Sequence, residues 1–305
     1  MSDVYLGVDL GGSSSKLLLA RAAGGAGGAG AAPEALWQHR LDGALVPGAL
    51  EALRDTVQAA AARTATTVQA IGVTVPGIVD ERTGVVRRSV NMPWLEGVSV
   101  PDRFGELLGA PAVAVHDGRA AALAEARLGA GRGSDDVFVL ALGTGVAGAH
   151  VVDGVVRTGA HDGAGEAGHV SLDPAGPPCG CGQRGCLEAY VGAPHLAAAW
   201  REATGDPDAD AAGLLRAAVA GDARAAAVVD DASGALARSI LALVAVVDPG
   251  RIVVGGGLGV PPSPLLAAAE RKAREGATFH RVPPVVAASL GPWAGAWGAV
   301  LAASR

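Results

Sequence analysis

The chain has 305 residues, of which half are hydrophobic and 18% are charged, and its formal net charge is −6 at pH 7. This composition is typical of a globular protein of about two domains. The acidic balance argues against a nucleic-acid partner, because such binding relies on clustered Lys and Arg side chains. The sequence starts without a signal peptide pattern, and no apolar run reaches the roughly 18 residues of a membrane span. We therefore expect a cytoplasmic protein that binds neither nucleic acid nor membrane.

Short apolar strands and amphipathic helices alternate along the sequence. Strands are predicted at residues 4–9, 16–20, 70–75, 113–115, 137–142 and 251–254. Helices are predicted at residues 50–63, 119–128 and 223–247, and residues 293–303 are expected to return as a helix onto the first domain. Residues 22–32 form a Gly/Ala stretch that we expect to be a mobile loop tip. The mixture predicts an α/β protein whose site lies at strand ends.

Three glycine-rich turns follow predicted buried strands. In the first, from Asp9 to Lys16, glycines let backbone N–H groups approach phosphate oxygens, and Asp9 is a candidate to hold hydrated Mg²⁺. The motif alone is weak, because a Gly-rich hairpin with a solvated Lys16 has the same pattern. Together the three turns predict a split nucleotide cleft. The candidate nucleotide-binding residues are Asp9, Gly11, Gly12, Ser13, Ser14, Lys16, Gly143, Thr144, Gly145, Gly255, Gly256 and Gly257.

The most specific motif gathers one histidine and the only three cysteines of the sequence. These candidate metal ligands are His169, Cys179, Cys181 and Cys186. One imidazole and three thiolates complete a tetrahedral shell that selects Zn²⁺ and leaves no position for water, so we expect a structural zinc. The alternative is three reduced cysteines in a Gly-rich loop. Glu166 and Glu188 flank the ligands, and folding around zinc is expected to bring their carboxylates toward a common point that suits the hydroxyls of a sugar.

His116-Asp117 stands between a predicted strand and a predicted helix. Asp117 is the candidate catalytic base, which would accept the proton of a hydroxyl that attacks a phosphoryl group. An alternative role is to cap the helix that begins at Gly118 or Arg119, and both roles are compatible.

These motifs resemble the ROK family (repressors, open reading frames, kinases) of the actin-like ATPase superfamily over nearly the whole chain. The resemblance rests on residues 9–16, 75–77, 91–94, 117, 142–145, 165–169, 179–188 and 255–257, which occur in family order. It implies two ribonuclease-H-like domains, which are separated by a cleft and close on ATP and Mg²⁺. It also implies that Asp117 is the base and that zinc is bound by the four candidate metal ligands named above. It also implies substrate contacts from Gly77, Asn91, Asp117, Glu166, His169 and Glu188. We expect residues 1–117 with 291–305 to form a small N-terminal α/β domain, and residues 118–290 a larger one that carries the zinc loop.

The sequence departs from the family at two places. Sugar kinases of the family usually have Asn before the catalytic Asp, but this chain has His116, which we also count among the substrate-binding candidates. A neutral His offers one donor and one acceptor on a larger ring, so it does not reproduce an amide. Either the substrate has a different hydroxyl pattern, or His116 points aside and glucose still binds. The first glycine turn has three serines where many members have Gly-Thr, and its hydroxyls are retained.

The leading expectation is ATP-dependent phosphorylation of a hexose hydroxyl, with glucose as the default substrate and a homodimer or higher homo-oligomer as the assembly. An alternative is a kinase of a cyclitol, carbasugar or amino sugar, with polyphosphate as a weaker alternative donor. A sugar-sensing repressor would need a DNA-binding helix-turn-helix, for which the sequence leaves no room before its first strand.

Overall fold

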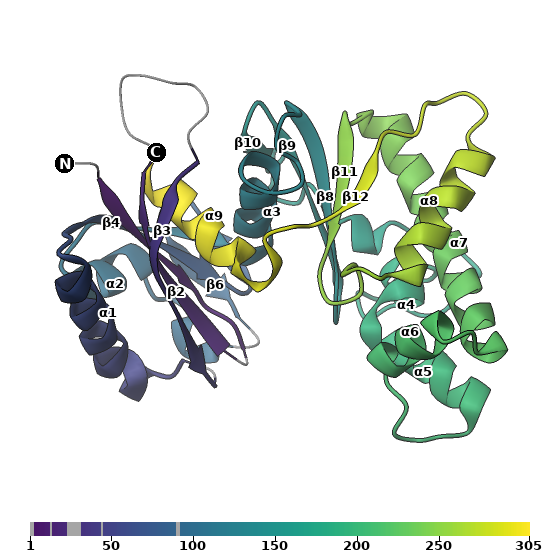
Figure 1. Cartoon of the computed structure of the whole chain (residues 1–305), viewed down its shortest axis with the longest axis horizontal. Coiled ribbons are helices and arrows are strands. Elements are labelled where there is room, and N and C mark those ends of the chain that lie inside the picture. The colour runs from purple at the N-terminus through teal and green to yellow at the C-terminus, as the bar shows by residue number, and fades with distance from the viewer. Residues whose placement is uncertain (1–2, 13, 23–31, 44, 90–91) are drawn as a thin grey trace. The chain divides into compact units, whose positions relative to one another are not determined.

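The structure, a computed structural model, describes residues 3–12, 14–22, 32–43, 45–89 and 92–305. The chain divides into two compact units, which are unit 1 (Met1–Ala124 with Pro292–Arg305) and unit 2 (Glu125–Gly291). Figure 1 shows their helices and strands, labelled where there is room. Two predicted site residues, Ser13 and Asn91, lie outside the described residues, as does the middle of the Gly/Ala stretch.

Unit 1 is built on a five-stranded sheet in the order β3-β2-β1-β4-β7. The first three strands are antiparallel neighbours, and β4 and β7 continue the sheet in parallel. The strands are β1 (Val4–Asp9), β2 (Ser14–Arg21), β3 (Glu34–Asp42), β4 (Val68–Val75) and β7 (Ala112–His116), with a hairpin of β5 (Ile78–Asp80) and β6 (Val85–Arg88). At the end of β1, Asp9 is opposite Lys16 on one side and Thr74 on the other. The register thus brings together polar residues from distant parts of the sequence.

Helices cover both faces of this sheet. Leu17 and Leu19 of β2 belong to a core with residues of α1 (Leu50–Thr64) and α2 (Val100–Leu108). The alternate residue Leu18 packs instead with α9 (Ala294–Ala303). In Figure 1, α9 lies on the face of the sheet opposite to α1 and α2. This alternation is the period of two expected of a strand that is buried on both faces.

Glycines let α9 approach the sheet closely. A methyl group at Gly7 or Gly72 would collide with the backbone carbonyl of Ala296 or Ala299, respectively. The prediction that the last segment returns as a helix onto the first part of the chain is confirmed, because α9 belongs to unit 1.

Unit 2 repeats the topology of unit 1. Its strand order is β10-β9-β8-β11-β12, again with three antiparallel neighbours followed by two parallel strands. The strands are β8 (Asp136–Leu142), β9 (Val146–Val152), β10 (Val155–Arg157), β11 (Arg251–Gly255) and β12 (Val285–Ala287). The helices are α3 (Asp117–Arg127, shared with unit 1), α4 (Glu188–Val191), α5 (Ala193–Thr204), α6 (Ala211–Val219), α7 (Ala223–Val247) and α8 (Pro264–Gly276). The prediction of an α/β protein is confirmed.

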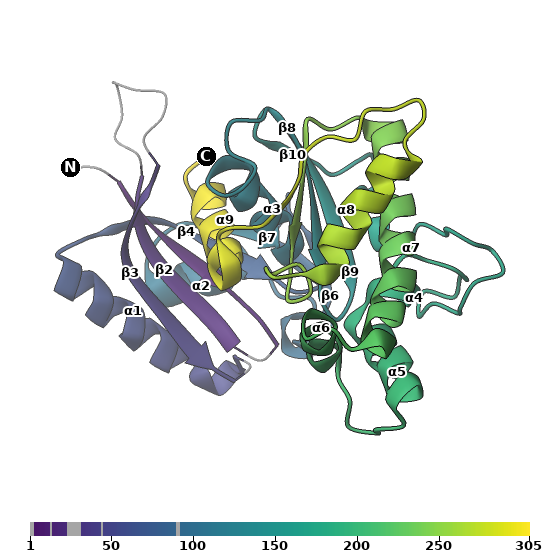
Figure 2. The ribbon, with the colours of Figure 1, turned by 45° about the vertical axis from the view of Figure 1, so that its right-hand side comes forward.

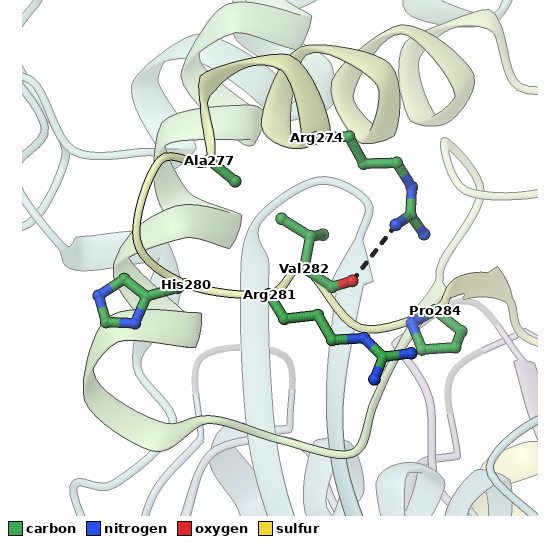
Figure 3. Close-up of a pocket in the computed structure, with 6 residues that line it drawn as sticks. All are labelled: Arg274, Ala277, His280, Arg281, Val282 and Pro284. Atoms are coloured by element: carbon green, nitrogen blue, oxygen red, sulfur yellow. Dashed lines mark hydrogen bonds between the residues drawn. The ribbon is translucent and has the colours of Figure 1, made fainter.

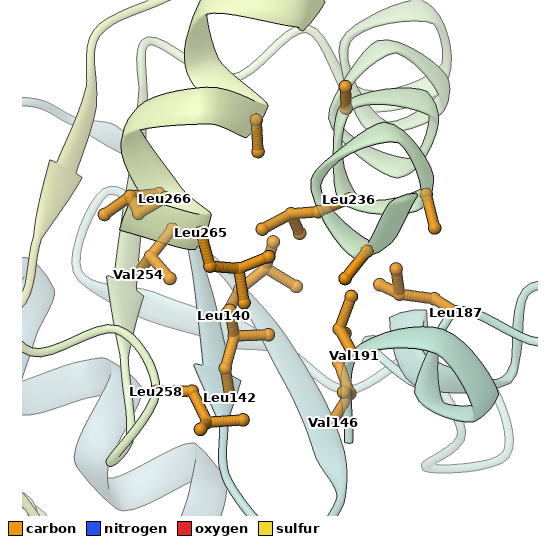
Figure 4. Packing of buried hydrophobic residues seen from close by; sticks show 14 of the residues in the cluster. Leu140, Leu142, Val146, Leu187, Val191, Leu236, Val254, Leu258, Leu265 and Leu266 are labelled. Carbon is orange, nitrogen blue, oxygen red and sulfur yellow. The ribbon is translucent and has the colours of Figure 1, made fainter. Parts of the chain in front are cut away.

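The core of unit 2 lies between its sheet and helices α7 and α8, which run side by side in Figures 1 and 2. In Figure 4, Leu140 of β8 and Val254 of β11 meet Leu236 of α7 and Leu265 of α8, and all four side chains are fully buried. Each such burial contributes about 1.5–3 kcal/mol to stability. Neither α7, with its 25 residues, nor any other described helix is long and apolar enough to cross a membrane.

A buried carboxylate ties two distant loops of unit 2 together. Glu125 is only 2% exposed, and its Oε2 accepts a 3.0 Å hydrogen bond from the backbone N–H of Ala130. Its carboxylate also accepts bonds from the backbone N–H groups of Ser289, at 3.0 and 3.1 Å, and Leu290, at 2.7 Å. Glu125 is the first residue of unit 2, so its side chain joins the start of the unit to residues 289–290 near its end.

Candidate functional site

The first glycine turn presents the carboxylate of Asp9 at the end of β1. Oδ1 of Asp9 accepts a 2.7 Å hydrogen bond from Oγ1 of Thr74, and Oδ2 accepts one of 3.1 Å from Nζ of Lys16. The Asp9 side chain is 13% exposed, so it is shielded but reachable. A carboxylate oriented by two donors fits a hydrated Mg²⁺, which proteins bind through one or two carboxylates while it keeps several waters. Lys16, predicted to bind nucleotide, is the ion-pair partner of Asp9.

The remaining described residues of this turn shape its backbone. A methyl group at Gly11 would lie 2.5 Å from the carbonyl oxygen of Ser14, so only glycine allows the chain to turn this tightly. Gly12 is exposed, and Ser14 is 6% exposed at the start of β2. Gly12, the exposed residue among them, is therefore a candidate to donate its backbone N–H to a phosphate oxygen.

Asp117 opens α3 directly after β7. The helix begins at Asp117 and not at Arg119, where the spacing predicted it, and Oδ1 of Asp117 accepts a 2.7 Å hydrogen bond from the N–H of Gly118. The same oxygen lies 3.5 Å from Nε2 of His116. Nδ1 of His116 has no hydrogen-bond partner among the described residues. The ring of His116 and the carboxylate of Asp117 thus lie next to each other at the strand end.

The surroundings of Asp117 favour its protonated form. Partial burial raises the pKa of Asp117 above its ordinary value of 3.8, and the like charge of Asp9 acts in the same direction. The charge of His116 and the N–H of Gly118 oppose this rise of the pKa. The side chain remains 41% exposed. A carboxylate with a raised pKa and access to solvent is suited to accept a proton from a bound hydroxyl.

Glu81, which the sequence did not single out, holds the strand end that carries Asp117. Its Oε1 accepts hydrogen bonds from the backbone N–H of His116, at 3.0 Å, and from Nη1 of Arg119, at 3.4 Å. Because β7 is an edge strand, its outer N–H groups have no strand partner, and a side chain satisfies one of them here. Glu81 lies in the turn between β5 and β6. Gly77, a predicted substrate contact, directly precedes β5 and has a φ of +128° that favours glycine.

In unit 2, the second and third glycine turns lie side by side. They follow β8 and β11, which are parallel neighbours, with Gly255 opposite Ala141. A methyl group at Gly256, whose φ is +80°, would collide with the carbonyl of Leu142, and the N–H of Leu258 donates a 3.1 Å hydrogen bond to that carbonyl. The sheet thus brings together two of the predicted nucleotide-binding segments.

These two turns border a hollow of about 790 Å³ in unit 2. Its walls are the glycine turns, helices α5 and α6, and the segment after β11, and most lining side chains are small and apolar. The lining residues are Gly143, Thr144, Ala193, Ala197, Asp210, Ala211, Ala212, Leu215, Arg216, Val219, Gly257, Leu258, Val260 and Pro262. The volume is in the range of pockets for nucleotide-sized ligands. The two glycine turns of this hollow were predicted from the sequence, whereas the walls from α5 and α6 carry no motif that the sequence analysis singled out.

The segment after the candidate metal ligands supports the second glycine turn. Glu188 opens α4, and its Oε2 accepts a 2.9 Å hydrogen bond from the N–H of Val146. A methyl group at Gly145 would lie 2.8 Å from that oxygen, so the carboxylate packs against the turn. Glu166, the other predicted carboxylate, is exposed directly before the short 3₁₀ helix Ala167–His169. Convergence of Glu166 and Glu188 on a sugar stays a prediction.

The four candidate zinc ligands lie together. The ligand atoms of His169, Cys179, Cys181 and Cys186 are all within 4.8 Å of one another. Nδ1 of His169 is 3.7 Å from Sγ of Cys179, and the Sγ atoms of Cys181 and Cys186 are 3.7 Å apart. Ligands at about 2.0–2.3 Å from a tetrahedral Zn²⁺ lie roughly 3.5–3.8 Å from one another, which these two 3.7 Å distances match. The sulfurs are too far apart for disulfides, whose S–S bond is about 2.05 Å.

The environment of Cys186 also suits a bound cation. Its side chain is fully buried. Burial raises the pKa of Cys186 to about 12, and the neighbouring thiols contribute to the rise. A thiolate at this position needs a positive partner, and the chemistry of the three sulfurs and one imidazole selects Zn²⁺.

A second hollow in unit 2, of about 420 Å³, is lined by basic residues of α8 and the segment that follows it. Figure 3 shows Arg274 turned toward the carbonyl oxygen of Val282, to which Nη1 donates a 3.3 Å hydrogen bond. In the same view, Arg281 extends toward Pro284 and His280 points away from both arginines. The basic groups do not converge on one point, so we place no site here.

Comparison with known proteins agrees with these features. Residues 5–305 match the ROK family. The glucokinase of Thermotoga maritima is 37% identical over 202 residues, a match that spans 62% of this chain and 63% of that enzyme. The N-acetylmannosamine kinase of Escherichia coli O157:H7 is 34% identical, over 75% of this chain and 78% of that enzyme.

Solved structures of the family have the same fold. The ROK hexokinase of Thermus thermophilus superposes with a TM-score of 0.86 and 32% identity over 99% of this chain and 98% of that one. A ROK glucokinase of Streptomyces griseus, solved with glucose and AMPPNP, has a TM-score of 0.77 and 27% identity over 99% of both chains. The prediction of two actin-like ATPase units is confirmed, and the chain belongs to the ROK family.

Proposed function

We propose that this chain transfers the terminal phosphoryl group of ATP to a hydroxyl of a hexose or hexose-like sugar, with glucose as the default substrate. The chain is a sugar kinase, given its family and its glucokinase and N-acetylmannosamine kinase relatives. The observation that carries the proposal is the placement of Asp9 and Asp117 at strand ends of one sheet, close enough for the charge of Asp9 to raise the pKa of Asp117. This juxtaposition places a candidate metal-binding carboxylate near a candidate base.

In the proposed mechanism, Asp117 accepts the proton of the attacking hydroxyl. The N–H of Gly118 orients its Oδ1, and Glu81 holds the backbone of the preceding residue, so the carboxylate is set before substrate arrives. Phosphoryl transfer passes through a loose transition state, and catalysis consists mainly of positioning and charge stabilisation. When bound through Asp9, Mg²⁺ would supply positive charge to the phosphates. The protein's task is to fix the carboxylates and exclude competing water.

The hollow of about 790 Å³ is the proposed site for the donor's nucleoside. Its apolar walls suit a purine ring, and Thr144 and Gly257, which line the hollow from the two glycine turns, are proposed to face the phosphates. The backbone N–H groups of the turns at residues 143–145 and 255–257 then serve as donors to phosphate oxygens. Polyphosphate as donor would leave these apolar walls without a ligand, which favours ATP.

An amino sugar is a second candidate substrate. The N-acetylmannosamine kinase relatives are about as similar to this chain as the glucokinase relatives are, and His116 replaces the Asn that sugar kinases of the family usually have. The proposed sugar contacts are Gly77, Asn91, His116, Asp117, Glu166, His169 and Glu188. His169 would coordinate zinc through one ring nitrogen and offer the other to a substrate hydroxyl.

A substrate panel tests the proposal. The purified protein is incubated with MgATP and with glucose, other hexoses, N-acetylmannosamine, N-acetylglucosamine or a cyclitol, and ADP release is measured. We expect the highest kcat/KM with glucose. A preference of tenfold or more for an N-acetylhexosamine would favour the second candidate, and ADP release no faster with any sugar than without sugar would refute the kinase proposal. His116→Asn serves as the matched variant, which should change the ranking of sugars if His116 contacts the substrate.

The zinc ion and the oligomeric state are part of the proposal. The His169/Cys₃ set is proposed to hold one structural Zn²⁺ that fixes the loop between Glu166 and Glu188. A homodimer or higher homo-oligomer is proposed by analogy with the family, and light scattering after size-exclusion chromatography measures it.

A further inference from the structure

The carboxylate of Asp9 is held from three sides by residues of unit 1. On one side, the hydroxyl of Thr74 donates to Oδ1 at 2.7 Å, and on the other, the ammonium of Lys16 donates to Oδ2 at 3.1 Å. Both partners come from the strands that flank β1, at the positions directly opposite Asp9. The sheet register therefore fixes both contacts.

The hydroxyl of Thr74 has a defined direction. Thr74 is fully buried, and its Oγ1 accepts a 3.1 Å hydrogen bond from the N–H of Leu10. A hydroxyl has a single O–H donor, and with a lone pair committed to Leu10, that donor is aimed at Asp9. These two hydrogen bonds, from Leu10 to Thr74 and from Thr74 to Asp9, thus anchor the carboxylate to the backbone of the turn that follows β1.

The third side is the first turn of α9. A methyl group at Gly295 would lie 2.5–2.8 Å from the three carboxylate atoms of Asp9. The absence of a side chain at Gly295 leaves the carboxylate just enough room to occupy the position that Thr74 and Lys16 define. The carboxylate is thus limited to one orientation.

We propose that Thr74 is a positioning residue that fixes the carboxylate of Asp9 for the Mg²⁺ ion of the donor nucleotide. The inference rests on the proposed function, because it assigns Asp9 to a magnesium nucleotide. Side chains that orient a metal-binding carboxylate are worth about 10- to 100-fold in metal affinity or activity. The isosteric change Thr74→Val, which removes both hydrogen bonds of the hydroxyl, should reproduce a loss of that size.

The experiment compares full-length wild type with Thr74→Val, Thr74→Ser and the control Thr56→Val. Thr56 is half-buried on α1, and its hydroxyl donates a solvent-exposed 2.7 Å hydrogen bond to the carbonyl of Ala52, so the control removes a threonine hydroxyl on an element that does not contact Asp9 among the described residues. Binding of ADP is measured by calorimetry with and without MgCl₂, and kcat and the sugar KM are measured with MgATP. The dissociation constant of ADP without MgCl₂ is divided by the constant with MgCl₂. This ratio reports how much magnesium strengthens ADP binding, independently of turnover.

We expect Thr74→Val to lower both this ratio and kcat by about 10- to 100-fold, with an unchanged sugar KM. Thr74→Ser, which restores the hydroxyl, should recover most of both values, and Thr56→Val should match wild type. A wild-type ratio and kcat in Thr74→Val would overturn the inference. Where Thr74→Val does not fold, Gly295→Ala decides, because it pushes the carboxylate away from Thr74 and Lys16 while both of these hydrogen-bond donors stay in place. A lowered ratio in Gly295→Ala supports the inference, and an unchanged ratio overturns it.

The failure of the proposed function has a different signature. A wild-type protein that phosphorylates no sugar, or an Asp9→Asn variant with full activity, contradicts the assignment of Asp9 to the nucleotide. An active wild type with an inactive Asp9→Asn and a wild-type-like Thr74→Val contradicts only the role of Thr74.

Discussion

Replacing Glu125 with alanine should destabilise unit 2 through a local and identifiable mechanism. The buried carboxylate accepts hydrogen bonds from three backbone N–H groups, those of Ala130, Ser289 and Leu290. Glu125→Ala leaves all three donors without their partner. Because these donors belong to two loops that are far apart in the sequence, no repacking within a single loop replaces the lost contacts.

The size of the effect follows from these three bonds. A buried donor left without a partner costs about 1–3 kcal/mol. Three fully buried donors would cost roughly 3–9 kcal/mol, but Ser289 is exposed and Ala130 and Leu290 are half-buried, so water satisfies part of this demand. We therefore expect a loss of about 3 kcal/mol at the lower end of the range. That value corresponds to a roughly 100-fold faster hydrogen exchange of the three amides, if they exchange by local opening.

Hydrogen–deuterium exchange measured by mass spectrometry resolves the peptides that contain residues 130 and 289–290, and urea denaturation measures the free energy of unfolding. The matched control is Glu275→Ala, which removes an exposed i,i+4 partner of Arg271 and should change the unfolding free energy by less than about 0.5 kcal/mol. Unchanged exchange of both peptides in Glu125→Ala, together with an unfolding free energy within 0.5 kcal/mol of wild type, as for the control, would refute the reasoning.

Three further predictions concern the proposed chemistry. Asp117→Asn should retain sugar binding by calorimetry while kcat falls by on the order of 10² or more, and near-normal turnover would exclude Asp117 as the base. Because partial burial raises the pKa of Asp117 above 3.8, kcat/KM should fall as the pH drops through this raised pKa, where the base becomes protonated, and a flat acidic profile would contradict the assignment. Metal analysis should find one zinc per chain, and Cys186→Ser should lose the metal and lower the Tm by about 5 °C or more, whereas a stable, zinc-free wild type would rule out a structural zinc.

Local signals in the sequence were sufficient to predict the type and the bounds of several helices and strands. The long helix was predicted at residues 223–247, its observed bounds, from its helical spacing and from Asp248-Pro249 at its end. In the structure, Asp222 also caps its start by accepting hydrogen bonds from the N–H groups of Arg224 and Ala225. The buried strands β1, β4 and β11 were identified by their apolar runs, to within two residues. The four candidate metal ligands were predicted to lie together, and their ligand atoms do lie within 4.8 Å of one another, because their spacing in the sequence is itself the signal.

Other elements depend on contacts that no local pattern encodes. The strand β3 has largely exposed side chains and was not predicted, since it exists through its pairing with β2. The same reason explains why Thr74 was missed as a partner of Asp9: 65 residues separate them, and only the sheet register makes them neighbours. Glu125 and the walls of the 790 Å³ hollow likewise meet their partners through tertiary packing.

Unit 1 is built from two separate stretches of chain, so it is complete during translation only after its second stretch has been made. The face of its sheet that α9 covers includes Leu18 and Ala20, yet α9 is translated only after the whole of unit 2. Unit 2 is continuous, so it has all of its residues while the ribosome still holds the missing helix of unit 1. During this interval an apolar sheet surface stays uncovered, and the nascent chain is open to chaperone binding until its last helix emerges.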